Sequence, residues 1–201
     1  MIKRLATFMC CALALLMVSC STESDTTEEY PDWQNRNESY FKLVSDSAKT
    51  AIASGSTQWK YIPGYTRNDS VAKNWDEYIV VKVLKEGTGT GCPIYTDSVK
   101  VHYRGRLLPS TSYQDGYVFD ESFSDDNLDV ATSTPTSFIV SGLINGMTTA
   151  LQNMHIGDYW RVYIPYTLAY GTSGTTGIPA YSTLIFDMQL DSYSRAGREM
   201  E

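Results

Sequence analysis

Cysteine and histidine are scarce in this sequence of 201 residues. Three of the four cysteines lie in the first twenty positions, so only Cys92 remains in the rest of the chain. A single thiol cannot form an intramolecular disulfide bond. The two histidines, His102 and His155, lie far apart and with one thiol give no plausible set of metal ligands. We therefore expect neither a metal site nor another cofactor.

Positive charge is also in short supply. The formal net charge is −7 at pH 7, and every acidic residue lies after position 22. Proteins that bind nucleic acids usually present basic surfaces. The charge balance therefore argues against a nucleic-acid partner.

Several motifs of catalysis and ligand binding are missing. The sequence has no Gly-x-Ser-x-Gly motif, which argues against a serine hydrolase of that type. The glycine-rich turn at residues 86–91 is followed neither by Gly-Lys-Ser/Thr nor by a predicted helix, which argues against a nucleotide site. Asp125, Asp126 and Asp129 lack the spacing of an EF-hand, so a solvated loop is favoured over a calcium site.

The first 19 residues have the features of a signal peptide. Lys3 and Arg4 precede an apolar run that ends at residue 18, shorter than the about twenty residues that a transmembrane helix needs. The sequence Leu-Met-Val-Ser-Cys at residues 16–20 resembles a bacterial lipobox. This resemblance predicts that Cys20 is lipidated and anchors the protein in the bacterial cell envelope, at the outer membrane on its periplasmic or surface-exposed side. An ordinary signal peptide cut nearby is the alternative.

The rest of the chain divides into four parts. Residues 20–30 are acidic and cannot bury apolar surface, which predicts a flexible tether. Residues 31–75 are expected to form a helical N-terminal extension, residues 76–194 the main domain and residues 195–201 a polar tail.

The extension is rich in aromatic residues. Asp32 can cap a helix whose apolar residues recur at helical spacing until Gly55 ends it. Trp59, Tyr61 and Tyr65 follow in a polar, turn-rich segment. We expect the aromatic stripe to pack on the domain behind it. A face for dimerisation or for binding another polypeptide is the alternative.

The main domain combines alternating strands with one short helix. Strands are predicted at residues 78–84, 99–104, 138–140, 160–164 and 184–190. A helix that begins near residue 143 places Met147, Ala150, Leu151 and Met154 on one face. Strands on both sides of a single helix predict an antiparallel α+β fold.

One stretch of this domain concentrates the functional side chains. Val99, Val101 and Tyr103 alternate with polar residues, and Gly105 permits a bulge directly afterwards. The chain then returns at residues 119–120, which brings a phenol, a phenyl ring and a carboxylate to one rim of the predicted sheet.

Four motifs in the domain occur in a fixed order. They are Val-His-Tyr-Arg-Gly at 101–105, Val-Phe-Asp-Glu-Ser at 118–122, the segment from Leu-Ile-Asn-Gly-Met to His-Ile-Gly at 143–157, and the segment from Ile-Pro-Tyr to Leu-Ile-Phe-Asp at 164–187. The ordered set resembles the FKBP-type peptidyl-prolyl cis–trans isomerases, a macrolide-binding immunophilin family. The resemblance covers about Asp76 to Ser194 and implies a curved antiparallel sheet wrapped around one short helix.

The resemblance also implies the positions of a site. Catalytic positions are implied at Tyr103, Phe119, Asp120, Ile144 and Tyr170, where the Ile144 N–H and the Tyr170 hydroxyl would bind substrate carbonyls and Asp120 would lie at the rim. Further substrate-binding positions are implied at Phe138, Leu143, Met147, Ile178, Tyr181 and Phe186. The implied partners are proline-containing polypeptides and macrolide inhibitors of the rapamycin class.

The chemistry of such a pocket is non-covalent. An X-Pro bond resists rotation by about 18–20 kcal/mol because amide resonance must be broken. A dry apolar pocket that binds the twisted amide better than either planar isomer lowers this barrier without a nucleophile or a metal. Met147 replaces the usual tryptophan of the pocket floor, and Thr136 replaces an aromatic wall residue. These departures keep an alternative open, an FKBP-fold binding or chaperone module with little or no turnover.

Overall fold

The computed structural model describes residues 28–67, 72, 74–124 and 128–198. The predicted signal peptide, Cys20 and most of the predicted tether lie outside the described residues. The same holds for Asp125 and Asp126, two members of the weighed calcium cluster.

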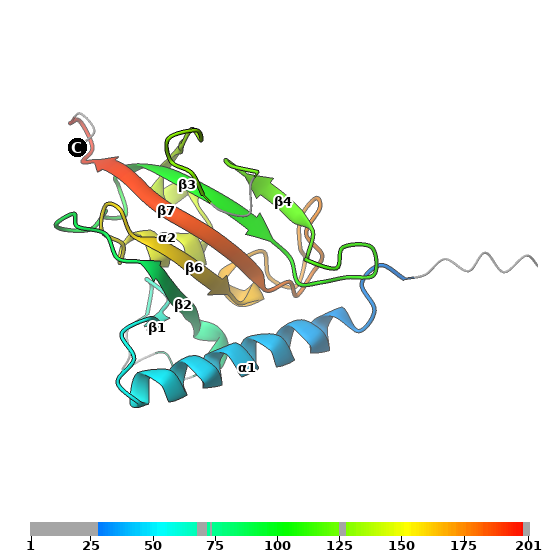
Figure 1. Ribbon diagram of the computed structural model, residues 1–201. Helices are drawn as coiled ribbons and strands as arrows, with labels where there is room; N and C mark the ends of the chain where they lie inside the picture. The colour runs from blue at the N-terminus through cyan, green and yellow to red at the C-terminus, as the bar shows by residue number, and fades with distance from the viewer. Residues whose placement is uncertain (1–27, 68–71, 73, 125–127, 199–201) are drawn as a thin grey trace, which may run out of the picture.

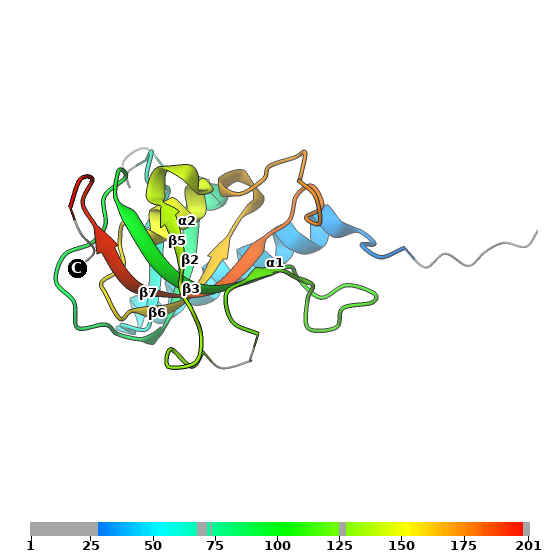
Figure 2. The same cartoon turned by 90° about the horizontal axis from the view of Figure 1, so that it is seen from above.

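The described chain forms one antiparallel sheet with helices on both sides (Figures 1 and 2). Its seven strands follow the order β1-β2-β6-β7-β3-β4, and β5 pairs with the beginning of β3 on the same edge as β4. The strands are β1 Trp59–Pro63, β2 Tyr78–Lys85, β3 Ser98–Arg106, β4 Val118–Glu121, β5 Thr136–Ile139, β6 Tyr159–Ile164 and β7 Leu184–Ser194. The helices are α1 Trp33–Ala53 and α2 Asn145–Leu151, with 3-10 turns at Trp75–Glu77, Val140–Gly142 and Tyr166–Leu168. The predicted α+β architecture is confirmed.

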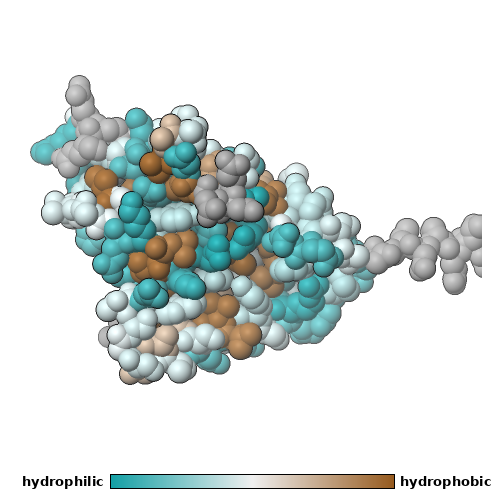
Figure 3. Space-filling view, viewed as in Figure 1, coloured by the Kyte–Doolittle hydropathy of each residue, from teal (hydrophilic) through white to brown (hydrophobic). Residues whose placement is uncertain are grey.

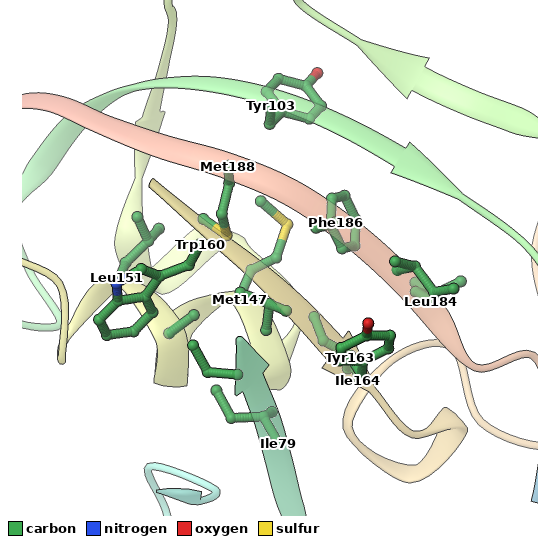
Figure 4. Packing of buried hydrophobic residues seen from close by; sticks show 14 of the residues in the cluster. Ile79, Tyr103, Met147, Leu151, Trp160, Tyr163, Ile164, Leu184, Phe186 and Met188 are labelled. Atoms are coloured by element: carbon green, nitrogen blue, oxygen red, sulfur yellow. The ribbon is translucent and has the colours of Figure 1, made fainter. Parts of the chain in front are cut away.

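Helix α2 packs tightly on one face of the sheet because it carries a glycine at its point of closest approach. A Cβ atom at Gly146 would lie 2.2 Å from Cγ2 of Ile164 in β6, so any larger residue would push the helix away. Met147, Ala150 and Leu151 are buried beneath the helix, where Figure 4 shows Met147 and Leu151 facing the sheet. The predicted apolar face of this helix is therefore confirmed.

Helix α1 packs on the opposite face of the sheet. Tyr163 directly precedes Ile164 in β6, so its side chain points to the face of the sheet opposite to α2. Its ring lies 6.3 Å from that of Tyr40 in α1. The buried residues of α1 form a single stripe, namely Trp33, Asn37, Phe41, Ser45 and Ala48. The extension thus packs on the domain, as the favoured interpretation of its aromatic stripe predicted.

Two details of the extension differ from expectation. Asp32 stands at the N-cap of α1, but its side chain accepts a hydrogen bond from the Asn35 side chain at 2.6 Å and caps no backbone N–H. The segment predicted to be turn-rich forms strand β1, in which Tyr61 pairs with Val80 of β2. The strand was not predicted because β1 lies at the edge of the sheet, where the sequence preference for strand structure depends strongly on the neighbouring strand.

The end of the predicted tether also differs from expectation. The Glu29 carboxylate accepts hydrogen bonds from Ser110 Oγ at 2.5 Å and from Ser112 N at 3.0 Å. The Thr111 hydroxyl donates to the Glu28 carbonyl at 2.8 Å. Residues 28–30 are therefore bound to the loop between β3 and β4.

The outer surface offers little continuous apolar area on the face shown in Figure 3. Hydrophobic residues there form small groups separated by hydrophilic ones. Among the described residues, none of the helices has the length and hydrophobicity to cross a membrane. The core instead lies between the sheet and its two helices.

Candidate proline-binding site

A cavity of about 490 Å³ opens between β3, β4, α2 and the loop that follows β6. Every position that the sequence predicted for the site lines this cavity except Tyr181. The predicted lining residues are Tyr103, Phe119, Asp120, Phe138, Leu143, Ile144, Met147, Tyr170, Ile178 and Phe186. The fold thus brings together side chains that are far apart in the sequence.

Aromatic rings form one wall of the cavity. The Tyr103 ring lies edge-on to Phe138 with centroids 5.5 Å apart, and Phe119 lies edge-on to Phe186 at 5.5 Å. Tyr103 and Phe186, whose centroids are 6.5 Å apart, connect the two pairs. Edge-to-face packing suits the quadrupoles of the rings and keeps their faces available to a ligand.

Gly105 allows these rings to approach one another. A Cβ at this position would lie 2.6 Å from two atoms of the Phe119 ring and 2.6 Å from Cε1 of Phe186. The pairing of β3 with β4 shifts register between Gly105 and Arg106, which is the bulge that the glycine predicted. The glycine therefore serves the packing of the cavity wall as well as the bend of the strand.

The phenol of Tyr103 and the carboxylate of Asp120 both line the cavity and interact with each other. Tyr103 is buried, and this burial raises the pKa of its phenol well above its ordinary value of 10. The Asp120 carboxylate raises this pKa further through hydrogen bonding and through its negative charge. The Tyr103 hydroxyl therefore stays protonated at neutral pH and remains a hydrogen-bond donor.

Two more donors face the opening. Ile144 is the N-cap of α2, in extended conformation, and no acceptor for its backbone N–H is found among the described residues. The Tyr170 side chain is 40% exposed and also lines the cavity, so its hydroxyl has access to a ligand. An apolar cavity with a few polar groups at its edge is the usual form of a site that orients a ligand within a hydrophobic pocket.

Comparisons with known proteins agree with this geometry. Residues 92–191 match the family model of the FKBP-type peptidyl-prolyl cis-trans isomerases. The macrophage infectivity potentiator of Trypanosoma cruzi is 34% identical over 190 residues, which are 94% of this chain and 83% of that protein. The chain belongs to the FKBP-type isomerase family.

Two Escherichia coli members of the FKBP family are also similar to this chain. The FKBP-type 22 kDa peptidyl-prolyl cis-trans isomerase is 36% identical over 132 residues, 65% of this chain, which spans only 57% of that relative. The crystal structure of FkpA superposes with a TM-score of 0.56 at 30% identity and covers 81% of this chain and 62% of its own.

One residue that the FKBP resemblance implied for the site is not among those that line the cavity. Tyr181 does not line the cavity: its ring packs edge-on to Tyr166 with centroids 5.2 Å apart, and its backbone N–H donates to the Gly171 carbonyl at 3.0 Å. Its φ of 62° is left-handed, a conformation that non-glycine residues seldom adopt. Tyr181 therefore holds the ends of the loop together.

Three lining residues were missed by sequence reasoning, namely Gly142, Thr175 and Thr176. Thr175 and Ile178 exchange two backbone hydrogen bonds of 2.9 and 3.0 Å and so form a small hairpin over the cavity. Threonine followed by Gly177 is a turn signal that could have indicated this hairpin.

The FKBP pocket of this chain has a methionine at its floor, whereas Thr136 does not line the cavity. Met147 and Phe186 are both almost completely buried beneath the cavity (Figure 4). Thr136 of β5 pairs with Val101 of β3. Its hydroxyl forms a hydrogen bond with the Tyr103 phenol, which lowers the pKa of that phenol. Within the described residues, His, Cys, Asp and Glu side chains nowhere gather in threes as metal ligands would.

Proposed function

We propose that this chain catalyses cis–trans isomerisation of X-Pro bonds in exported or envelope proteins. The observation that supports the proposal is the single cavity in which Tyr103, Phe119, Ile144, Tyr170 and Phe186 meet. Its volume of about 490 Å³ accommodates a proline ring together with the residue before it.

The proposed mechanism divides the work between the wall and the rim. The aromatic wall takes up the proline ring and excludes water, which favours the less polar twisted amide over the planar one. The Ile144 N–H and the Tyr170 hydroxyl hold the substrate carbonyls on either side of the rotating bond. Because the amide is bound best when twisted, the barrier of about 18–20 kcal/mol falls without any bond being made or broken.

The test is isomerisation of a short X-Pro peptide by the full chain. Wild type should accelerate exchange, and Phe119→Ala should lower kcat/KM about tenfold because a rim aromatic contact with the substrate is lost. Leu43→Ala is the matched control, since Leu43 is 65% exposed on α1 and does not line the cavity. No acceleration by wild type on any X-Pro peptide would reject the proposal.

A binding or chaperone module with little turnover is the second candidate function. Its support is the methionine at the floor, since Met147 is more flexible than a ring and orders the bound amide less strictly. Binding of a proline-containing peptide without acceleration of exchange would favour this alternative. A macrolide of the rapamycin class is expected to fill the same cavity and to compete with the peptide in both cases.

We further propose that the protein is held in the cell envelope by a lipid on Cys20. The lipobox-like sequence at residues 16–20 supports this proposal. Cys20→Ala should release the protein from membranes or block its maturation. A native protein that starts at another residue and carries no lipid would overturn it.

A further inference from the structure

A second hollow of about 340 Å³ lies on the other side of the hairpin that covers the proline-binding cavity. Its lining residues are Tyr30, Ser173, Thr175, Gly177, Ile178, Pro179 and Ala180. Thr175 and Ile178 line both hollows, so the two lie side by side with the hairpin as a common wall. We call this second hollow the hairpin groove.

The hairpin groove is built from two distant parts of the chain. Tyr30 comes from the segment before α1, and the other lining residues come from the loop between β6 and β7 (Figure 2). The Trp33 indole joins the two parts, because its Nε1 donates to Ser182 Oγ at 2.9 Å in a buried position.

Tyr30 is held firmly in its place. Its ring lies edge-on to Trp33 with centroids 4.8 Å apart. Glu29, the residue before it, accepts hydrogen bonds from Ser110 Oγ and Ser112 Oγ, both at 2.5 Å. The ring is therefore a preorganised wall, and a ligand that contacts it loses little free energy in ordering it.

The chemistry of the hairpin groove is apolar and uncharged. Tyr30, Pro179 and Ile178 offer rings and an aliphatic chain, two hydroxyls lie at the edge, and none of the described lining residues carries a charge. Gly177 stands at the hairpin tip with φ 77°, so the tip adds no side chain to the groove. Such a surface suits an aromatic or aliphatic side chain of an extended polypeptide.

We propose that the hairpin groove is an extended substrate subsite in which Tyr30 contacts an apolar side chain that flanks the isomerised proline. This inference rests on the proposed isomerase function and adds a specificity-determining residue to it. The occupant is the flanking segment of the same polypeptide, because the groove lies next to the cavity that holds its proline and shares the hairpin wall with it. Short peptides that end at the proline-binding cavity do not reach the groove.

The experiment compares three substrates that share one X-Pro core and uses the full chain. The first is a short peptide, the second is a long peptide with Gly/Ser flanks, and the third is equally long with aromatic and aliphatic flanks. Wild type should turn over the third with a kcat/KM about three- to tenfold above that of the second. In Tyr30→Ala this ratio should fall to about one, whereas Tyr30→Phe keeps the ring and should keep the ratio.

Tyr113→Ala is the matched control, because Tyr113 is an exposed tyrosine that packs on Tyr117 and does not line the groove. It should keep the ratio of wild type. A Tyr30→Ala variant that keeps the ratio, or a wild type with equal turnover of both long peptides, would overturn the inference. Equal losses on all three substrates would do so too, since Tyr30 would then act only by supporting the hairpin.

A binding measurement separates this inference from the proposed function. Titration with the apolar-flanked peptide should shift the amide resonances of Gly177 and Ala180 in wild type and leave them unmoved in Tyr30→Ala. If wild type turns over no short peptide but shows these shifts, the isomerase proposal fails and the subsite stands. If turnover is present and the shifts are absent, the subsite is rejected and the isomerase proposal stands.

Discussion

Replacement of Gly105 by alanine tests the packing of the cavity wall most directly. The new methyl group would lie 2.6 Å from Phe119 and 2.6 Å from Phe186, about 1 Å inside ordinary van der Waals contact. Phe186 is almost completely buried and cannot retreat without disturbing the core. Relief must therefore come from rotation of the Phe119 ring and a shift of β4 away from β3.

The expected cost follows from this overlap. Overpacking by one methyl group in a well-packed region typically destabilises a protein by about 1–3 kcal/mol. For a chain of this size that corresponds to a fall in Tm of about 2–12 °C. Because the ring that must move lines the cavity, kcat/KM for an X-Pro peptide should fall by more than the loss of folded protein explains.

Thermal unfolding and peptide isomerisation of Gly105→Ala measure the two effects. Gly142→Ala is the stability control, since a Cβ at Gly142 would meet no atom within 4 Å. In a Phe119→Leu background the alanine should cost less, because the two ring atoms it would strike are gone. Unchanged Tm and unchanged turnover in Gly105→Ala would refute the reasoning.

Three further predictions concern the rim, the floor and the N-terminal segment. Tyr170→Phe should keep the fold and lose about 0.5–1.5 kcal/mol of substrate orientation, seen as a two- to twelvefold lower kcat/KM; an unchanged value would remove Tyr170 from the site. Met147→Trp should maintain or raise turnover if a flexible floor limits the wild type, and a stable variant with lower turnover would contradict this. The pKa of Glu29 is lowered from 4.5 by the Ser110 hydroxyl and then by Ser112, so its contribution to stability is present above pH 4.5 and lost as pH falls through the lowered value. The Ser112 amide resonance should therefore titrate with a midpoint below 4.5 in wild type and not in Glu29→Gln.

The FKBP resemblance could assign the residues of the proline-binding cavity because its motifs lie mostly in elements whose local structure the sequence determines strongly. Tyr103 is on an alternating strand, and the apolar face of α2 fixes the side on which Met147 lies. Sheet register does the rest, since Gly105 pairs with Phe186 and Val99 with Phe138. Residues in regular elements thus carried most of the prediction.

The features that sequence reasoning missed depend on contacts between distant parts of the chain. Tyr181 has an αL conformation and donates its backbone N–H to the Gly171 carbonyl, and neither feature leaves a local pattern in the sequence. Glu29 belongs to an acidic run typical of a tether, and only the serines of a loop far along the chain hold it in place. Such side-chain contacts are invisible to periodicity.

The boundary predicted at residue 76 follows the extent of the family motifs rather than the packing. The fully buried Asn37 of α1 accepts a hydrogen bond from the Thr183 backbone N–H at 2.8 Å, directly before β7. Strand β1 covers the edge of β2, which would otherwise expose unpaired backbone groups. The loop that closes the proline-binding cavity is therefore supported at its far end by α1, and the extension shapes the cavity although it contributes no residue to its lining.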